Sequence, residues 1–438
     1  MTGRFGDPPN ADFPACTPSS RSARWSELAF WLLIGAAAVN HYSLQIFGLK
    51  VYPEYIALAL NVALITLAAR RGLTRLYLPS AMWLLAAWLA VALFASAVNA
   101  PDKIHSLILW NKLLFAVLTY AVAANLTRGR SVQAITTQCL IAALVALLGL
   151  LIQVIWEFTR IDLGTQTAPN GARVVYGTLW EADIFGSFVT AALLLAVVLV
   201  SARSPIPTRR LRTLSGLTIL LGAPALIVSA SRSAWLALVG ALLVAGIFRL
   251  GQWLNGPQKI QRALVVSSLT VSVILFSFYA IVPQLDPYEG AFLARRVGSF
   301  VDLRGDAALA LRVEVLANAI TVWKQHPWVG WGVGAYGDMF SMPYSDERGW
   351  VSNLFIHQLF DTGLLGLVAF VSAVSVVAWR GLRAWHVVEG VRRSILGGLL
   401  LALLGLMIAF QATEASWLAF PWIYLGMLEG ATRENTRS

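Results

Sequence analysis

Long apolar segments are the feature that most constrains how this chain can fold. Roughly 20 consecutive apolar residues span a bilayer as a helix, and the chain contains at least ten such stretches. Of its 438 residues, 58% are hydrophobic and only 13% are charged. A soluble domain cannot bury that much apolar surface, so the sequence predicts an all-α, polytopic bundle of transmembrane helices, with the lipid bilayer as a partner.

Hydropathy predicts twelve spans and one large loop. The spans cover residues 28–46, 53–69, 78–98, 106–126, 133–156, 183–202, 213–230, 233–250, 263–283, 352–379, 394–411 and 415–430. The pairs around Ser231 and Glu414 each contain about 35 apolar residues, which suit two crossings better than one long bent helix. The predicted organisation is a disordered tail (1–27), spans one to nine (28–283), a large loop (284–351), spans ten to twelve (352–430) and a second tail (431–438).

The distribution of charge predicts the orientation. With the N-terminus inside, the cytoplasmic segments contain 21 of the 33 lysines and arginines but only 6 of the 22 acidic residues. This asymmetry follows the positive-inside rule, so both tails are predicted to be cytoplasmic and the large loop to be external. The formal net charge of +11 therefore reflects membrane topology, and nucleic acid is not a predicted partner. No cleavable signal peptide is apparent.

Arginines on the predicted outer side run against that bias. Six lie in two external loops, namely Arg160, Arg173, Arg295, Arg296, Arg304 and Arg312. One interpretation is an anion site, because guanidinium groups bind phosphate oxygens bidentately and stay charged. The other is loop solvation and pairing with nearby acids. Arg232, in "IVSASRSAWLALVGALLV", lies between two spans, where it either faces a water-filled cavity with a negative partner or snorkels to lipid headgroups.

A polar stripe begins the tenth span, "WVSNLFIHQLFDTGLLGLVAF". Residues four apart share a helix face, so Asn353, His357 and Asp361 are predicted to line up. A carboxylate one turn from an imidazole suits a general base; a hydrogen-bond network between helices is the alternative. The five histidines lack metal-ligand spacing, and no metal site is predicted. Cys16 and Cys139 are badly placed to pair.

Four segments resemble the O-antigen ligase/polymerase superfamily of membrane glycosyltransferases. The first is "SRSAWL", similar to the family's Arg-x-x-x-Leu element, with Arg232 and Leu236. The second is "RVEVLANAITVWKQHPWVGWGVGAYGDMF", with Arg312, His326, Pro327, Gly330, Gly332 and Gly334. The third is "SNLFIHQLFDTGLLG", in which nine residues separate Asn353 from the Gly-x-x-Gly of Gly363 and Gly366. The fourth and weaker match is "ARVVYGTLWEADIFGSF", with Arg173, Gly177 and Glu181.

The resemblance implies a GT-C-like, metal-independent, inverting glycosyltransferase without a cofactor, in the bacterial inner membrane and with a periplasmic active side. Its implied donor is a glycan on undecaprenyl diphosphate, and its acceptor is a sugar hydroxyl of a glycan or of lipid A–core. It implies diphosphate or substrate binding by Arg173, Arg232, Arg295, Arg296, Arg312, His326, Ser352 and Asn353. It also implies that His357, Asp361 or Glu181 accepts the proton of the acceptor hydroxyl.

One departure bears on the type of enzyme. Ser352 stands where lipopolysaccharide ligases of the family have histidine, and serine is no base near neutral pH without help. His357 is expected to supply the imidazole from a shifted position. This favours a polymerase of O-antigen or exopolysaccharide repeats over a lipid A–core ligase or a protein O-oligosaccharyltransferase. The alternative of another class is a transporter of polysaccharide or lipid-linked sugar, which should show broken helices in paired positions and a site at the midplane.

Overall fold

The computed structural model of the protein describes residues 20–46, 49–71, 76–167, 173–201, 209–253, 307–340 and 350–433. Within these ranges the chain is mostly helical, and two short antiparallel hairpins are its only sheets. The all-α prediction is therefore confirmed. The predicted ninth span, 263–283, lies outside the described residues, as do Arg295 and Arg296.

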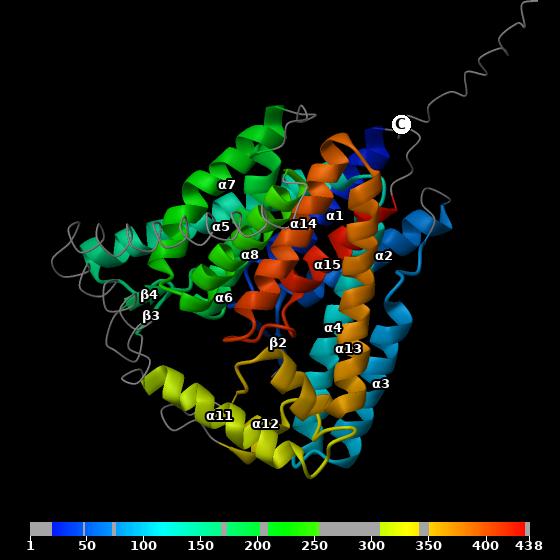
Figure 1. The fold of residues 1–438 in the computed structure, drawn as a ribbon, viewed down its shortest axis with the longest axis vertical. Helices are drawn as coiled ribbons and strands as arrows, with labels where there is room; N and C mark the ends of the chain where they lie inside the picture. Colours follow the sequence, from blue (N-terminus) through cyan, green and yellow to red (C-terminus); the bar gives the residue numbers. More distant parts are fainter. Residues whose placement is uncertain are drawn as a thin grey trace, which may run out of the picture.

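Eleven helices of the described residues form the bundle (Figure 1). They are α1 (Ser20–Ala37), α2 (Pro53–Arg70), α3 (Met82–Val98), α4 (Lys103–Thr127), α5 (Ser131–Thr159), α6 (Ala182–Val200), α7 (Arg209–Val228), α8 (Arg232–Trp253), α13 (Leu354–Val387), α14 (Gly390–Ala409) and α15 (Ala419–Thr432). Among the described residues, seven of these helices are long and apolar enough to cross a membrane, and three shorter apolar helices accompany them. The polytopic character is thus confirmed, while the count of twelve spans stays a prediction.

The first span was predicted to end too late in the chain. Helix α1 ends at Ala37 rather than near residue 46, and β1 (Leu44–Ile46) pairs with β2 (Leu49–Val51) in an antiparallel hairpin. The polar residues Asn40 and His41 interrupt the apolar run at this point. The paired spans around Ser231 and Glu414 are separate helices, as predicted. Ala230, with φ at 49°, stands between α7 and α8, and residues 410–418 separate α14 from α15.

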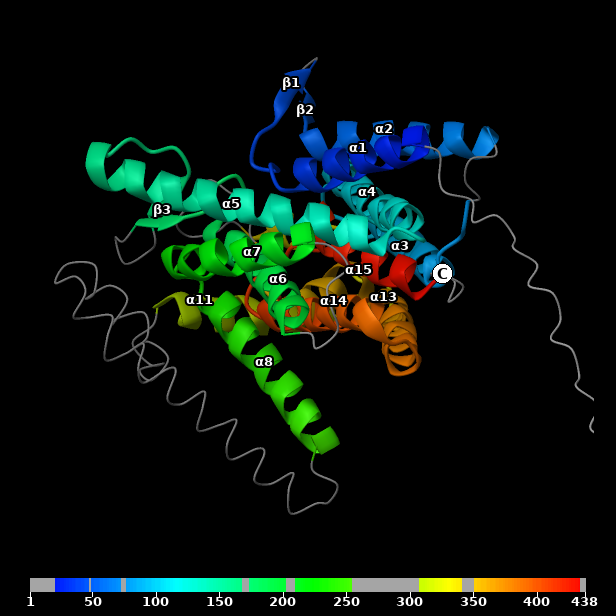
Figure 2. The ribbon, with the colours of Figure 1, turned by 90° about the horizontal axis from the view of Figure 1, so that it is seen from above.

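Small residues allow the helices to pack closely. Helix α6 packs against α7, α8 and α14, and α15 packs against α4. Gly405 of α14 faces Leu194 of α6 so closely that a Cβ at this position would meet the leucine side chain. Gly426 of α15 lies directly on the backbone of α4. Close approach through glycine is characteristic of helix contacts in membranes. Figure 2 shows α1 and α2 side by side at one edge, with α8 at the opposite side.

Two helices of the predicted large loop lie across one end of the bundle. Helix α11 (Ala307–Trp323) and the short α12 (Ala335–Met339) lie beneath it in Figure 1. This is called the α11 end. Arg312 of α11 forms an ion pair with Asp183 in the first turn of α6, and Asp338 of α12 pairs with His105 in the first turn of α4. These four residues, all predicted to lie on the outer side, are therefore gathered at the α11 end.

Residues predicted to be cytoplasmic gather elsewhere, around a buried carboxylate. Glu429 of α15 accepts hydrogen bonds from the hydroxyls of Tyr77 and Ser80. Arg380 and Arg433 approach the same carboxylate to 4.0 and 3.8 Å. Arg380 lies near the C-terminal end of α13. The N-terminal end of α13 lies beside the loop that precedes α12, to which it is hydrogen-bonded. The helix ends that meet around Glu429 are all predicted to be cytoplasmic, and those that meet at the α11 end are all predicted to be external.

The orientation can be measured by labelling. In a variant without native cysteines, Lys324→Cys places one thiol after α11, and Glu389→Cys places one between α13 and α14; both positions are exposed. A membrane-impermeant maleimide applied to intact cells should label Lys324→Cys alone, because the arginine asymmetry puts the α11 end outside. Labelling of Glu389→Cys alone would reverse the topology.

Candidate active site

The central feature of the α11 end is a histidine between two carboxylates. Helix α13 begins after Asn353, whose side-chain oxygen accepts hydrogen bonds at 3.1 Å from the backbone amides of Phe355 and Ile356. This cap fixes the first turn. One turn apart on the helix, His357 and Asp361 then meet, with Nε2 3.1 Å from Oδ2. The predicted pairing on one helix face is confirmed, while Asn353 serves as the cap.

Glu414 completes the group from another part of the chain. Its Oε2 lies 3.2 Å from His357 Nδ1, and its side chain is fully buried. The Ser416 amide donates a hydrogen bond of 2.6 Å to the other oxygen of Glu414. The loop reaches this position because the Leu354 amide bonds to the Phe410 carbonyl, which ties the start of α13 to the end of α14. In the sequence Glu414 marks a break between two predicted spans, and no role in the site was predicted for it; an acid between two apolar spans was the signal that could have indicated one.

A glycine-rich loop holds Asp361 from the far side. The Gly334 amide donates to Asp361 Oδ2 at 3.2 Å, and the Gly332 amide donates to the Asp361 carbonyl at 2.9 Å. Further along, the Leu364 amide bonds to the Pro327 carbonyl at 2.9 Å. Helix α13 is kinked at Gly363, where φ is 62° and ψ is −170°. Because the kink interrupts the hydrogen bonds within the helix, these carbonyls and amides can bond to the loop. The loop therefore fixes the carboxylate against the imidazole.

Glycine is required where the loop and the kink touch. Gly330 and Gly363 both have positive φ, and a Cβ on either would collide with the backbone of the other segment. His326, predicted to bind substrate, belongs to the same loop. Its ring packs edge-on against Trp331 at 4.1 Å, and its carbonyl accepts from the Gly330 amide. In these contacts His326 shapes the loop.

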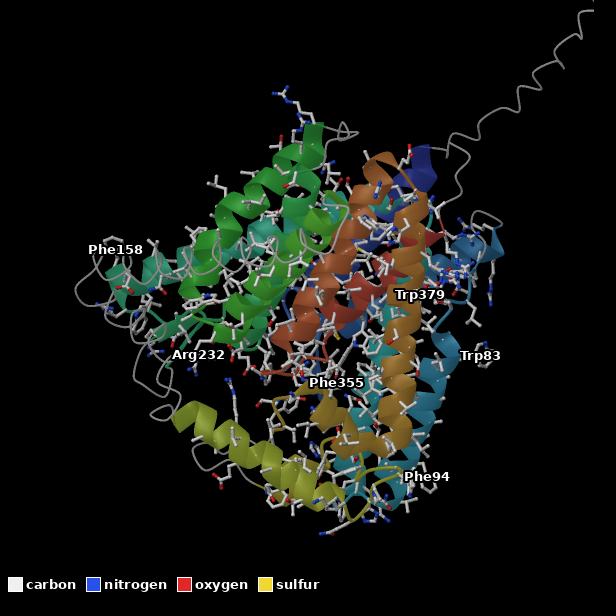
Figure 3. All side chains as sticks on the ribbon, in the orientation of Figure 1. Trp83, Phe94, Phe158, Arg232, Phe355 and Trp379 are labelled. Carbon is white, nitrogen blue, oxygen red and sulfur yellow. The ribbon has the colours of Figure 1, made fainter. Side chains whose placement is uncertain are left out.

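An arginine and a second carboxylate form the next part of the site. Arg312 Nη2 lies 3.1 Å from Asp183 Oδ2. The Ser231 hydroxyl donates to the other oxygen of Asp183 at 2.6 Å, directly before Arg232 begins α8. Figure 3 places Arg232 at the end of α8 that faces α11. Asp183 therefore joins the start of α8, which carries Arg232, to Arg312, and it is a residue that sequence reasoning missed.

Two short segments connect the arginine to the histidine. Glu181 and Asp183 are neighbours at the start of α6, and Glu181 Oε1 accepts a hydrogen bond of 3.0 Å from the Thr413 hydroxyl. Thr413 directly precedes Glu414. Hence Glu181, predicted to accept a proton, links the two halves of the site instead of touching the imidazole in the contacts seen here.

Arg173 is engaged with its own loop. Its guanidinium lies 2.8 Å from Asp162 Oδ2 and stacks on the Trp156 ring at 4.3 Å. Desolvation tends to raise the pKa of Asp162, but hydrogen bonds from Thr165, Gly164 and Arg173 outweigh it and hold the pKa below its ordinary value. In these contacts Arg173 follows the second interpretation of the external arginines, which was pairing with nearby acids. The hairpin of β3 (Thr165–Thr167) and β4 (Arg173–Val175) thus stabilises its own loop.

Two further points complete the site. Ser352 is half-buried immediately before the Asn353 cap. Within the part of the chain that the structure describes, no group of three or more His, Cys, Asp and Glu side chains is arranged to hold a metal ion.

Fold and site together define a polytopic α-helical membrane protein with a polar centre at one end of its bundle. Residues 217–371 match a family model described as O-antigen ligase. The match confirms the predicted resemblance to the O-antigen ligase/polymerase superfamily, and it indicates a membrane enzyme of polysaccharide assembly. It covers Arg232, Arg312, the glycine-rich loop, His357 and Asp361, but ends before Glu414. A search of curated proteins gave no match.

Substitution of Gly363 tests the contact between kink and loop. Gly363→Ala should destabilise the protein by clearly more than Gly390→Ala, a control with φ at 65° and nothing within 4 Å of its would-be Cβ. The control carries only the cost of a left-handed residue, about 1–2 kcal/mol, whereas Gly363→Ala must also displace the Trp328 and Val329 backbone. Thermal unfolding of both variants in detergent compares them, and equal shifts would contradict the packing described.

Proposed function

We propose that this protein transfers a glycan from undecaprenyl diphosphate to a sugar hydroxyl during assembly of a surface polysaccharide. The observation that carries the proposal is the joining of a guanidinium centre, Arg312 with the start of α8, to the buried histidine centre through residues 181–183 and 413–414. Such a reaction needs a cation for the leaving diphosphate and a group that takes the proton of the acceptor. Both are held at the α11 end.

The proton goes to the histidine centre. His357 Nε2 lies 3.1 Å from Asp361 Oδ2, and His357 Nδ1 lies 3.2 Å from Glu414 Oε2, so the proton enters a group of three side chains that are in direct contact through the imidazole. As the acceptor hydroxyl loses its proton to this unit, its oxygen bonds to the anomeric carbon of the donor. The bond from that carbon to the diphosphate oxygen breaks, and the electron pair leaves with the diphosphate. Attack opposite to the leaving group inverts the configuration.

The diphosphate is stabilised by arginine. Arg312 is oriented by Asp183 before the substrate arrives, which limits the reorganisation needed when charge develops. Its guanidinium has further N–H groups than the one that faces Asp183, and these suit phosphate oxygens. Arg232 follows Ser231, a ligand of the same carboxylate, and contributes the second cation. The donor therefore lies with its phosphates toward α11 and α8 and its sugar toward α13.

The favoured type is a polymerase that extends a glycan on the periplasmic face of the inner membrane. Ser352 replaces the histidine that marks ligases, and His357 supplies the imidazole one helical turn beyond Asn353. Transfer to lipid A–core or to protein is the alternative within the class. Transport is disfavoured because the polar groups of the candidate site gather at the α11 end of the bundle, whereas transporters place their site near the midplane.

Arg312→Ala should reduce transfer about 10²–10³-fold, the usual cost of losing one charged contact to the transition state. The assay is reconstitution in liposomes with undecaprenyl-diphosphate repeat units, followed by separation of products by length. A ladder on the same lipid identifies a polymerase, and product only on lipid A–core or protein identifies a ligase. Arg383→Ala is the matched control, since Arg383 stacks on Trp379 at 5.4 Å and lies in the last turns of α13. Wild-type transfer by folded Arg312→Ala would contradict the proposal.

His357→Gln should lower the rate about 10²–10⁴-fold, because general base catalysis contributes that much. Glu414→Gln should lower it as well, since the amide keeps the shape of the carboxylate but not its charge. His386→Gln, at the other end of α13, is the control. The turnover number is measured at saturating donor. If His357→Gln retained the wild-type turnover, the proton would have to leave through another group.

A further inference from the structure

A row of aromatic side chains adjoins the histidine centre. The Trp350 ring packs edge-on against His357, with centroids 5.0 Å apart, and against Trp417 at 5.9 Å. Trp417 in turn contacts Trp180 at 6.0 Å. Three segments that are distant in sequence thus contribute one tryptophan each. The row Trp350–Trp417–Trp180 is called the aromatic wall.

The wall continues to the start of the first hairpin. The centroid of the His41 ring lies 5.9 Å from that of Trp180 and 4.9 Å from that of Tyr176. Burial lowers the pKa of His41, which favours the uncharged ring that stacks as an aromatic group. The Thr178 hydroxyl donates to the Ala38 carbonyl at 2.7 Å and holds the two loops together.

Unlike core tryptophans, the wall is partly accessible. Trp88 and Trp422, which stack inside the bundle, are 0% and 3% exposed. Trp180 is 38% exposed, and Trp350 and Trp417 are half-buried. Lys112 of α4 lies over the Trp417 ring at 5.1 Å, and this cation–π contact helps to fix the orientation of the ring. Partly exposed aromatic side chains that contact one another suit a binding surface better than a core.

The position of the wall identifies its ligand. Trp180 precedes Glu181, which accepts a hydrogen bond from Thr413 and lies two residues before Asp183, the partner of Arg312. Trp417 follows Glu414 by three residues. The donor sugar is held through its diphosphate at the arginines, whereas the acceptor must bring a hydroxyl to His357, which Trp350 touches. A pyranose ring presents an apolar C–H face that packs on indole, and its hydroxyls remain at the edge for water and polar groups.

We propose that the aromatic wall binds the pyranose rings of the acceptor glycan and presents one of their hydroxyls to His357. The proposal rests on the proposed function, which it deepens by naming the acceptor subsite. Trp350 positions the sugar that reacts, and Trp417 and Trp180 hold the sugars that follow it along the acceptor.

Trp180→Ala and Trp417→Ala test the wall, with Trp83→Ala and Trp379→Ala as controls. The controls remove tryptophans that are 76% and 57% exposed, on α3 and α13. The probe is the oligosaccharide released by mild acid from the undecaprenyl-diphosphate repeat unit used in the transfer assay. Each wall variant should raise the KM for acceptor about tenfold, the loss expected for one aromatic contact, and leave the donor KM and the turnover number nearly unchanged. Trp180→Phe should restore most of the affinity.

A second experiment separates this proposal from the one on which it rests: calorimetry measures the affinity of each variant for the same oligosaccharide in the absence of donor. If Arg312→Ala transferred normally while Trp180→Ala lost binding, the transfer mechanism would fail and the wall would stand. If folded Trp180→Ala and Trp417→Ala both bound the oligosaccharide as the wild type does, the wall would be overturned. Equal losses in the control variants would overturn it too. Trp180 is more exposed than Trp417, so Trp180→Ala keeps the test valid should Trp417→Ala fail to fold.

Discussion

The contact between His357 and its two carboxylates is the constraint on which the rest of this end of the protein depends. Ionisable groups away from water are costly unless they are paired and hydrogen-bonded, and here Asp361 and Glu414 face the two ring nitrogens at 3.1 and 3.2 Å. Each carboxylate needs its own support. The Gly334 amide bonds to Asp361, and the Ser416 amide bonds to Glu414. The kink at Gly363, the glycine-rich loop and the turn between α14 and α15 are therefore consequences of holding one imidazole.

The same support connects chemistry to substrate. Residues 180–183 contribute Trp180 to the aromatic wall, Glu181 to the link with Thr413, and Asp183 to Arg312. Residues 413–417 likewise contribute Thr413, Glu414 and Trp417. Because each segment is short, a shift of one part moves the others with it. In the proposed reaction this arrangement keeps the anion site, the proton acceptor and the acceptor sugar in register, which is the condition for in-line displacement.

Much of this could be predicted from the sequence, for reasons that are local. Apolar length predicts the helices, and the helical period predicts that His357 and Asp361 meet. Contacts that depend on tertiary folding were not predictable. Glu414 reaches the imidazole only because the loop after α14 folds back on the start of α13, and Asp183 reaches Arg312 only because α11 crosses the end of the bundle. Arg173 shows the converse, since a local hairpin gives it Asp162 as a partner. The end of the first span was predicted too late in the chain because hydropathy alone did not register the break at Asn40 and His41.

The most direct measurement is a structure determined by electron cryomicroscopy with a non-hydrolysable undecaprenyl-diphosphate sugar bound. The account predicts density for the diphosphate between Arg312 and the start of α8, with the sugar directed toward His357 and Glu414. Diphosphate density at the opposite group of charges, where Arg380 and Arg433 surround Glu429, would contradict it. So would a sugar placed at the α11 end but directed away from His357.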